Sequence, residues 1–436
     1  MNHRRAVGPI VLPSTILCLM SLACVPIGDR AGDSAARASS QPASEPARVW
    51  TQTGPETSGL RAFDEVMASY MKDRDISAGS LAVLRNGRLV LARGYSWAPE
   101  GRPPVLPTAM FRIASVSKPI TAVGVLQLVE QGKLRLDQPI GEFLDVSRWR
   151  DKRIAQVTIR HLLTHRGGWD RGKAFDPMFR DQIIAKALGR PLPTVPQMVI
   201  DYMATQPLQF DPGTKYAYSN FGYCILGRII EKVTGLSYED FIRERVLAPI
   251  GAGGMRVGHS LPAQRFPGEV EYVDLSNSRE DNVMGANPPA KVPETYGGFN
   301  LHTMDAHGGW IASAVDLARF SAALDPKGKA RLLSATWLEE MWKRPPGVPD
   351  SDQGFYALGW SVRVVGEGRM NTWHNGSLPG TFTVLVRRWD GLSWVALFNQ
   401  RSEGKSMPPS EAIDGLLHQA ADRVTQWPDH DLFERF

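Results

Sequence analysis

Two hairpin signals, one near each end of the chain, constrain the fold more than any other feature of the sequence. Asn86-Gly87 and Asp390-Gly391 each separate two β-prone runs, and the four runs are residues 80–84, 88–92, 382–387 and 393–399. An Asn-Gly or Asp-Gly pair in such a setting is the strongest short-range signal for a β-hairpin. Because both ends of the chain supply strands, the simplest solution is one antiparallel sheet built from the two ends.

Helical patterns fill the middle of the chain and flank the two hairpins. Apolar side chains recur at helical spacing from Leu60 to Tyr70, and residues 411–424 carry an amphipathic pattern after the second hairpin. Four further runs between the hairpins have the helical period, at residues 120–131, 221–233, 238–247 and 315–324. The sequence therefore predicts an α+β fold, in which the antiparallel sheet is flanked by helices and carries an inserted, mainly helical lobe.

The expected domain covers residues 58–430, with an α/β lobe (58–110 plus 306–430) and a helical lobe (111–305). The chain has 436 residues, of which 43% are hydrophobic and 22% charged, enough for a sizeable core. Residues 262–306 carry prolines, glycines and polar residues with little periodicity. That texture is typical of a long loop bordering an active site.

The N-terminus has the features of an export signal. His3, Arg4 and Arg5 precede an apolar run at residues 11–23, which ends in the small-residue pattern of a cleavage site. Residues 1–23 are therefore expected to be a signal peptide, and the protein is expected in the periplasm, in the cell envelope or outside the cell. The polar segment that follows, 24–57, is expected to be a disordered tether, with order beginning near Leu60.

The cysteines leave one alternative open. Cys24 stands directly after the expected cleavage site, where bacterial lipoproteins carry an acylated cysteine, so membrane attachment through a Cys24 lipid and simple secretion both fit. With Cys18 and Cys24 in the leader, the folded part keeps only Cys224, which lies in an apolar run. The sequence therefore predicts no internal disulfide and a buried, inert thiol at Cys224.

The charge distribution gives no reason to expect nucleic acid as a partner. The net charge is +5, and the Lys and Arg residues are scattered among nearly as many Asp and Glu. No metal and no cofactor are expected either, because His-Glu-x-x-His and clustered Cys/His patterns are missing.

The first candidate catalytic motif is Ser115-Val116-Ser117-Lys118, a Ser-x-x-Lys sequence at the start of an apolar helix. Three residues along a helix bring Lys118 onto the same face as Ser115, where its amine can reach the hydroxyl. Apolar surroundings would desolvate the lysine and lower its pKa, making it a candidate base. The free N–H groups and the dipole of the first turn favour an oxyanion.

Other matches to the short motifs have less favourable contexts. Ser402 to Lys405 also fits Ser-x-x-Lys, but it lies in a polar, Gly-containing loop. Among candidates for a downstream His-x-Gly motif, His307 leads into a helix, whereas His374-Asn375-Gly376 leads into a run with strand character. His165 precedes the tyrosine motif described next and so breaks the expected order.

Tyr218-Ser219-Asn220 lies between these motifs and precedes a helix. Ser-x-x-Lys, Tyr-x-Asn and His-x-Gly in this order resemble class C β-lactamases, D-alanyl-D-alanine peptidases and the esterases related to them, within the β-lactamase and penicillin-binding-protein superfamily. The resemblance covers roughly residues 60–425. Tyr216 lacks the Asn two places on and is interpreted as a packing residue.

The resemblance implies a role for each motif residue. Ser115 would attack a carbonyl and form an acyl-enzyme, while Lys118 and Tyr218 would handle its proton. Tyr218 could act as a base only if nearby cations lowered its pKa. Asn220 would hydrogen-bond Lys118 and the substrate, and the N–H groups of Ser115 and Ser377 would bind the oxyanion.

The third motif departs from the β-lactamase pattern, since His374 and Asn375 replace a Lys-Thr pair. The resemblance assigns His374 to the catalytic residues and Asn375 and Gly376 to substrate binding, but a histidine is a weaker handle for a carboxylate than lysine. The sequence therefore predicts a serine hydrolase that acts on ester or amide bonds of small substrates, of carboxylesterase or D-amino-acid peptidase type. The alternatives are a true β-lactamase or D-alanyl-D-alanine carboxypeptidase, and a non-catalytic peptidoglycan-binding envelope protein.

Overall fold

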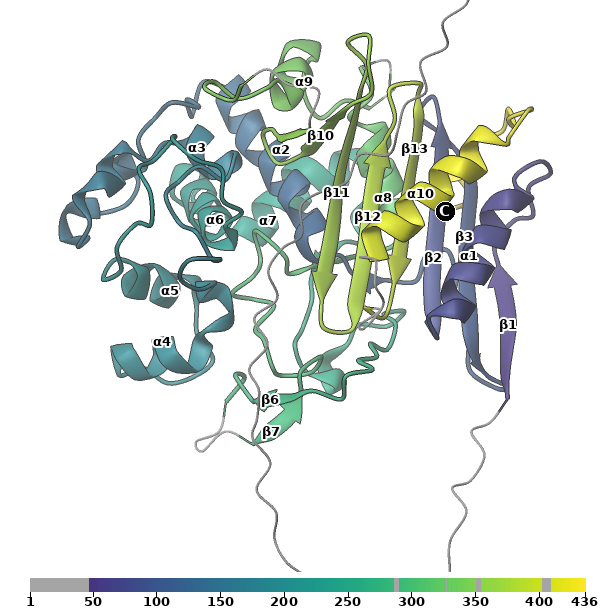
Figure 1. The fold of residues 1–436 in the computed structure, drawn as a ribbon, viewed down its shortest axis with the longest axis horizontal. Coiled ribbons are helices and arrows are strands. Elements are labelled where there is room, and N and C mark those ends of the chain that lie inside the picture. The colour runs from purple at the N-terminus through teal and green to yellow at the C-terminus, as the bar shows by residue number, and fades with distance from the viewer. Residues whose placement is uncertain (1–46, 286–289, 327, 329, 350–353, 402–408) are drawn as a thin grey trace, which may run out of the picture. The chain divides into compact units, whose positions relative to one another are not determined.

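An eight-stranded antiparallel sheet joins the two ends of the chain (Figure 1). The structure is a computed structural model that describes residues 47–285, 290–326, 328, 330–349, 354–401 and 409–436. The sheet runs in the order β1-β3-β2-β13-β12-β11-β10-β9. Its strands are β1 (Arg48–Thr53), β2 (Ala78–Arg85), β3 (Arg88–Pro99), β9 (Phe355–Tyr356), β10 (Ser361–Val364), β11 (Met370–Leu378), β12 (Thr381–Arg387) and β13 (Leu392–Phe398).

The central pairing confirms that both chain ends build one sheet. β2 pairs with β13 in a register that runs from Arg85 opposite Leu392 to Gly79 opposite Phe398. Both expected hairpins are present. Asn86 and Gly87 have φ values of 51° and 75°, as a two-residue turn between twisted strands requires.

Strand β1 corrects the expected disordered tether of residues 24–57. Arg48 to Thr53 pair with the second half of β3, and the Trp50 ring stacks on Tyr95 with ring centroids 5.5 Å apart. Val49, Trp50 and the two threonines favour a strand, but so short a run becomes ordered only through its pairing with β3. Residues 1–46, with the expected signal peptide and Cys24, lie outside the described residues, and export stays a prediction.

Helices cover both faces of the sheet. On one face, α1 (Arg61–Asp73) and α10 (Pro409–Asp422) pack over an apolar cluster that includes Trp394 and Phe398. On the other face, α8 (Ala314–Ala322) packs against β2 and β13, and the intervening residues Val395 and Leu397 join a second cluster. Alternate side chains of β13 therefore point to opposite faces of the sheet and pack into two separate apolar clusters.

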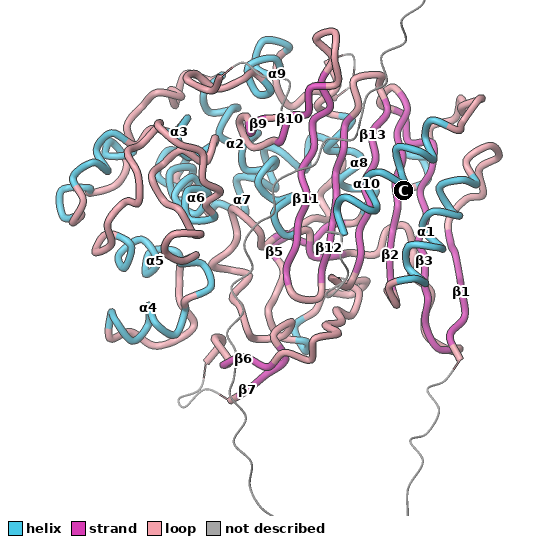
Figure 2. Tube along the Cα trace, in the orientation of Figure 1, coloured by secondary structure: helices cyan, strands magenta, loops and turns pink. Residues whose placement is uncertain are grey.

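The inserted helical lobe lies beside the β11 side of the sheet, as Figure 2 shows. Its helices are α2 (Ser117–Glu130), α3 (Ile159–Leu163), α4 (Asp181–Leu188), α5 (Pro196–Met203), α6 (Asn220–Thr234) and α7 (Tyr238–Ile242). Helix α9 (Ala335–Trp342) contacts α2. None of the helices in the described part of the chain combines the length and apolarity that a bilayer crossing needs.

Small strands and loops close the lobe against the sheet. The strands β4 (Phe111–Arg112), β8 (Trp310–Ala312) and β5 (Arg256–Val257) form a three-stranded sheet, and β6 (Arg279–Asp281) pairs with β7 (Lys291–Pro293). The described part of residues 262–306 is otherwise mostly loop, as expected. The buried Arg112 guanidinium holds this loop in place. It donates to the Thr295 carbonyl at 2.7 Å and lies 4.1 Å from the centre of the Tyr272 ring.

Candidate active site

Ser115 stands on a tight turn between β4 and α2. A 3₁₀ turn of residues Ala114–Val116 runs directly into the helix. Ala114 has a φ of 46°, a left-handed conformation that is strained for a residue with a Cβ and is typical of functional turns. The turn places Ser115 in the wall of a cavity of about 380 Å³.

Lys118 lies one turn further along, completely buried. Its Nζ is 3.0 Å from Ser115 Oγ and donates a hydrogen bond to the His307 carbonyl at 2.9 Å. Burial lowers the pKa of Lys118 well below its usual value, because a charged amine is poorly solvated there. The amine is therefore suited to accept a proton at neutral pH.

Tyr218 approaches Ser115 from the start of α6. Its hydroxyl hydrogen-bonds Ser115, and the centre of its ring lies 4.8 Å from the Lys118 amine and 4.7 Å from the Arg171 guanidinium. Burial nevertheless raises the pKa of Tyr218, and the hydrogen bond and Arg171 offset only part of that rise. The phenol keeps its proton at neutral pH, which makes Lys118 the better base of the two.

Asn220 does not contact Lys118, so that expectation is wrong. Its Nδ2 donates to Asp176 at 2.7 Å, and its buried Oδ1 has no hydrogen-bond partner among the described residues. The second partner of Lys118 is the His307 carbonyl instead. A backbone carbonyl carries no sequence signal, and Asp176 lies in a loop 44 residues before Asn220.

The His-x-Gly motif lies inside β11, not ahead of a strand as its context predicted. Pairing between β10 and β11 ends at Trp373, so the edge from His374 to Leu378 faces the turn that carries Ser115. A Cβ on Gly376 would come 2.2 Å from the Ile113 oxygen and 3.0 Å from the Ser115 nitrogen. Only glycine permits this approach, which brings the backbone before Ser377 against the nucleophile.

Asn375 and Ser377 line the cavity, whereas His374 does not. The His374 ring is 3% exposed; its Nδ1 donates to the Asn375 carbonyl at 2.7 Å, and its Nε2 lies 2.9 Å from the Tyr356 hydroxyl. Burial lowers the pKa of His374 to about 3. The residue is therefore neutral and cannot hold a substrate carboxylate, which corrects the expectation that it is a weak charge handle in the site.

His165, Tyr218 and Tyr356 form an aromatic cluster that the sequence did not predict. The centre of the His165 ring lies 4.2 Å from the centre of the Tyr218 ring and 4.5 Å from that of Tyr356. His165 Nδ1 also accepts a hydrogen bond from the backbone N–H of Ser219 at 3.2 Å. His165 thus fixes the turn that presents Tyr218. Tyr216, interpreted as a packing residue, is instead 45% exposed and lines the cavity.

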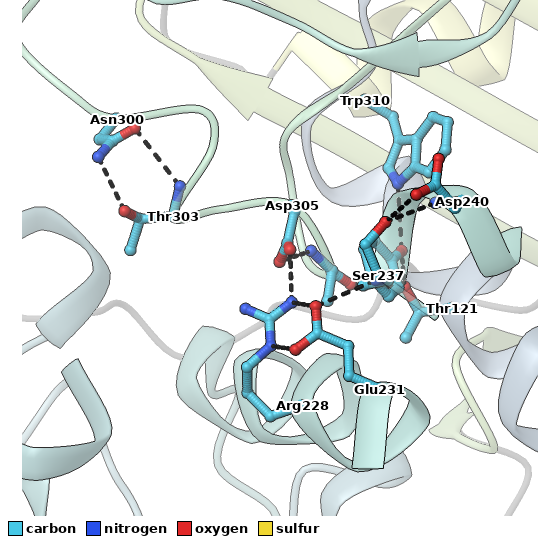
Figure 3. Close-up of polar contacts among 11 residues, drawn as sticks. Thr121, Arg228, Glu231, Ser237, Asp240, Asn300, Thr303, Asp305 and Trp310 are labelled. Carbon is cyan, nitrogen blue, oxygen red and sulfur yellow. Dashed lines mark hydrogen bonds and ion pairs between the residues drawn. The ribbon is translucent and has the colours of Figure 1, made fainter. Parts of the chain in front are cut away.

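A partly buried polar network holds the turn that carries the His307 carbonyl (Figure 3). Arg228 on α6 reaches Asp305 at 2.6 Å and Glu231 at 2.7 Å, and Asp305 accepts the backbone N–H of Ala306. Thr121 on α2 donates to the Ala306 carbonyl at 2.6 Å. The turn is therefore anchored to α2, which carries Lys118, and to α6, which begins two residues after Tyr218.

Cys224 and a second Ser-x-x-Lys match are the other candidates from the sequence. Cys224 is buried, and burial raises the pKa of its thiol to about 12, so the inert role predicted for it holds. The second Ser-x-x-Lys match, from Ser402 to Lys405, lies outside the described residues. Among the side chains that the structure describes, no group of three or more is arranged to hold a metal ion.

Comparison with known proteins identifies the family. The model of the family described as Beta-lactamase matches residues 63–417. Penicillin-binding protein 4* of Bacillus subtilis (strain 168) is 28% identical over 348 residues, which cover 78% of this chain and 70% of that protein. Esterase EstB of Burkholderia gladioli is 31% identical over 205 residues, 43% of this chain and 49% of the esterase.

A solved structure shares the fold. D-amino acid amidase from Ochrobactrum anthropi SV3 superposes with a TM-score of 0.64 at 22% identity, over 84% of this chain and 99% of the amidase. The chain spans 70% of the length of the penicillin-binding protein and about half the length of the esterase. Because the family model matches most of the chain, and the three motifs meet in one site, this protein belongs to the Beta-lactamase family.

Proposed function

We propose that this protein is a serine hydrolase that forms an acyl-enzyme on Ser115 and cleaves small esters. The observation that carries the proposal is the 3.0 Å distance between Lys118 Nζ and Ser115 Oγ in a site where the lysine is fully buried. A nucleophile next to a base with a lowered pKa is the arrangement that acyl transfer needs.

The reaction follows from the positions of the groups. Ser115 Oγ attacks the substrate carbonyl carbon while its proton passes to Lys118 Nζ. The N–H groups of Ser115 and Ser377 stabilise the oxyanion, and the leaving alkoxide takes the proton as the ester bond breaks. Water then attacks the acyl carbonyl while its proton passes to Lys118, and the bond to Ser115 Oγ breaks as that oxygen takes the proton back and the acid is released. Tyr218 stays protonated and supports the Ser115 oxygen by hydrogen bonding.

Ester cleavage is favoured over β-lactam hydrolysis by the third motif. His374 is neutral, buried and outside the cavity, so β11 presents no cation at the position where β-lactamases of this branch carry lysine. The match to an enzyme named as an esterase supports the same choice. The more extensive match to a penicillin-binding protein supports a second candidate, in which penicillin acylates Ser115 and the acyl-enzyme is long-lived.

Covalent labelling and turnover together test the proposal. A fluorophosphonate should add its mass to the tryptic peptide that contains Ser115, and Ser115→Ala should lose both the label and ester turnover. Ser402→Ala, which removes the other Ser-x-x-Lys serine, should keep both. Label on the Ser402 peptide would contradict the assignment, and faster turnover of a chromogenic cephalosporin than of a short-chain ester would contradict the substrate preference.

A further inference from the structure

The cavity at Ser115 has a one-sided charge. Among the described residues that line it, Arg171 is the one with a permanently charged side chain, and none is acidic. His307 also lines it, but burial lowers the pKa of that ring well below its usual value. The remaining wall includes the apolar side chains of Phe179, Met304 and Leu378. A ligand that fills this space meets apolar surface, uncharged polar groups such as Asn375 and Ser377, and one cation.

Arg171 keeps its hydrogen-bonding capacity for a ligand. Its side chain is 49% exposed, and its Nη1 lies 3.5 Å from Asp176 Oδ2, beyond a strong hydrogen bond. The same Asp176 oxygen already accepts the Asn220 Nδ2 at 2.7 Å. Arg171 therefore has one long ion pair, with Asp176, and no hydrogen bond to another described residue, so the donors that do not face Asp176 can meet a planar anion.

The position of Arg171 relative to the nucleophile is also fixed. The guanidinium lies 4.7 Å from the centre of the Tyr218 ring, and the hydroxyl of that ring reaches Ser115. One side chain, Tyr218, therefore contacts both the cation and the reacting serine. A carboxylate bound at Arg171 would belong to the same small molecule as the scissile carbonyl, a few bonds away from it.

We propose that Arg171 forms an anion subsite and that the substrates of this protein are small esters carrying one carboxylate. The inference rests on the proposed ester hydrolysis at Ser115 and specifies its substrate class. Arg171 supplies the cavity with the charge that His374 does not. The carboxylate belongs either to the acyl part or to the leaving group of the ester.

Three substrates distinguish these sources. Phenyl acetate is neutral, monophenyl glutarate carries the carboxylate on the acyl part, and 3-acetoxybenzoate carries it on the leaving group. Arg171→Gln should lower kcat/KM for one of the carboxylated esters about fivefold to tenfold more than for phenyl acetate, the effect of one partly exposed ion pair. Arg171→Lys should keep part of the preference for the carboxylated ester, because lysine keeps the positive charge but lacks the paired N–H donors of the guanidinium.

Arg180→Gln is the matched control. Arg180 is exposed, follows the cavity residue Phe179 and does not itself line the cavity, so its loss changes the net charge equally but should leave all three rates unchanged. Added salt should slow the wild-type protein on the preferred carboxylated ester more than on phenyl acetate. Equal effects of Arg171→Gln on all three esters would overturn the subsite.

Binding separates this inference from the proposed function. Calorimetric titration of benzoate into the wild-type protein and Arg171→Gln needs no turnover. Benzoate binding that weakens at least fivefold in Arg171→Gln supports the subsite even if no ester is hydrolysed, in which case only the proposed reaction fails. Absent binding, or equal binding by both proteins, overturns the subsite even if Ser115 proves to be the nucleophile.

Discussion

The two faces of the central sheet differ in what they bury. Under α1 and α10, the buried cluster is built from apolar and aromatic side chains such as Phe63, Trp394 and Phe398. On the side of the helical lobe, the core surrounds a fully buried lysine, Lys118, and a 3% exposed histidine, His374. The first face is mostly apolar, and its buried Arg93 is paired with Asp64 of α1 at 3.5 Å. The second face instead buries a lysine and a histidine whose pKa values burial lowers.

The difference separates stability from function within one sheet. Burying a large apolar side chain stabilises a fold by roughly 1.5–3 kcal/mol. Lys118 and His374 act in the opposite direction, because burial lowers the pKa of each. Below their ordinary pKa values the unfolded chain takes up protons that the folded chain does not, so each group destabilises the folded state. The apolar face supplies the stability that lets the active site keep them.

The largest expected effects come from mutating one buried residue on each face, Lys118 and Trp394. Lys118→Met should lower kcat/KM at least about 10³-fold, about 4 kcal/mol, because the base is lost. The same variant should raise Tm by a few degrees at pH 7.5, since the unfolded protein no longer gains a proton at this position. Steady-state ester hydrolysis and calorimetry measure the two quantities.

Trp394→Ala is the counterpart on the apolar face. Its side chain is fully buried under α10, and its removal should cost about 3–5 kcal/mol in the free energy of unfolding. Ester turnover measured well below the Tm should stay within about twofold of wild type. A Lys118→Met protein that is less stable than wild type, or a Trp394→Ala protein whose turnover collapses while folded, would break the division between the faces.

A second, smaller effect concerns the pH dependence of stability. The pKa of His374 is about 3 in the folded protein and about 6.5 when solvated, so stability is lost as pH falls below 6.5 toward 3. At pH 5 the loss attributable to His374 is about 2 kcal/mol. His374→Gln keeps both hydrogen-bonding positions and cannot be protonated, so it should remove that loss.

Denaturant unfolding at pH 7.5 and pH 5 checks this prediction. The drop in unfolding free energy between the two pH values should be about 2 kcal/mol smaller in His374→Gln than in wild type. His430→Gln, which changes an exposed histidine near β3, should reproduce the wild-type drop. Identical drops in wild type and His374→Gln would show that the ring takes up a proton in the folded state.

What the sequence could predict follows from the range of the interactions involved. The Asn86-Gly87 turn and the Ser115–Lys118 pair depend on residues within a few positions of each other, and both were predicted correctly. β1 was missed because its order comes from pairing with Gly94 to Pro99, not from its own composition. Asp176 was missed for the same reason, since its contact with Asn220 spans 44 residues.

Buried environments were predicted less well than residue identities. The lowered pKa of Lys118 was expected, because apolar neighbours surround the motif in the sequence. The position of His374 behind the strand edge was not expected, since a two-residue period gives the face of a side chain only once the strand itself is placed. β11 begins at Met370, ahead of the motif, whereas the strand was expected only after Gly376.

The smallest expected effect tests whether the polar network of the active-site face serves catalysis or only stability. Asp305→Asn removes the charge that holds Arg228, while Glu231 stays as a partner. The turn should loosen at the His307 carbonyl and misplace Lys118 Nζ, so kcat should fall about tenfold with little change in KM, as expected for a lost positioning contact.

Asp390→Asn is a matched control, because Arg388 there likewise keeps a second carboxylate, Asp422. Both variants should lose stability, since each weakens a partly buried ion pair, but only Asp305→Asn should lose kcat. Equal kcat values in the two variants, measured below both Tm values, would show that the network around Asp305 stabilises the lobe without positioning the base.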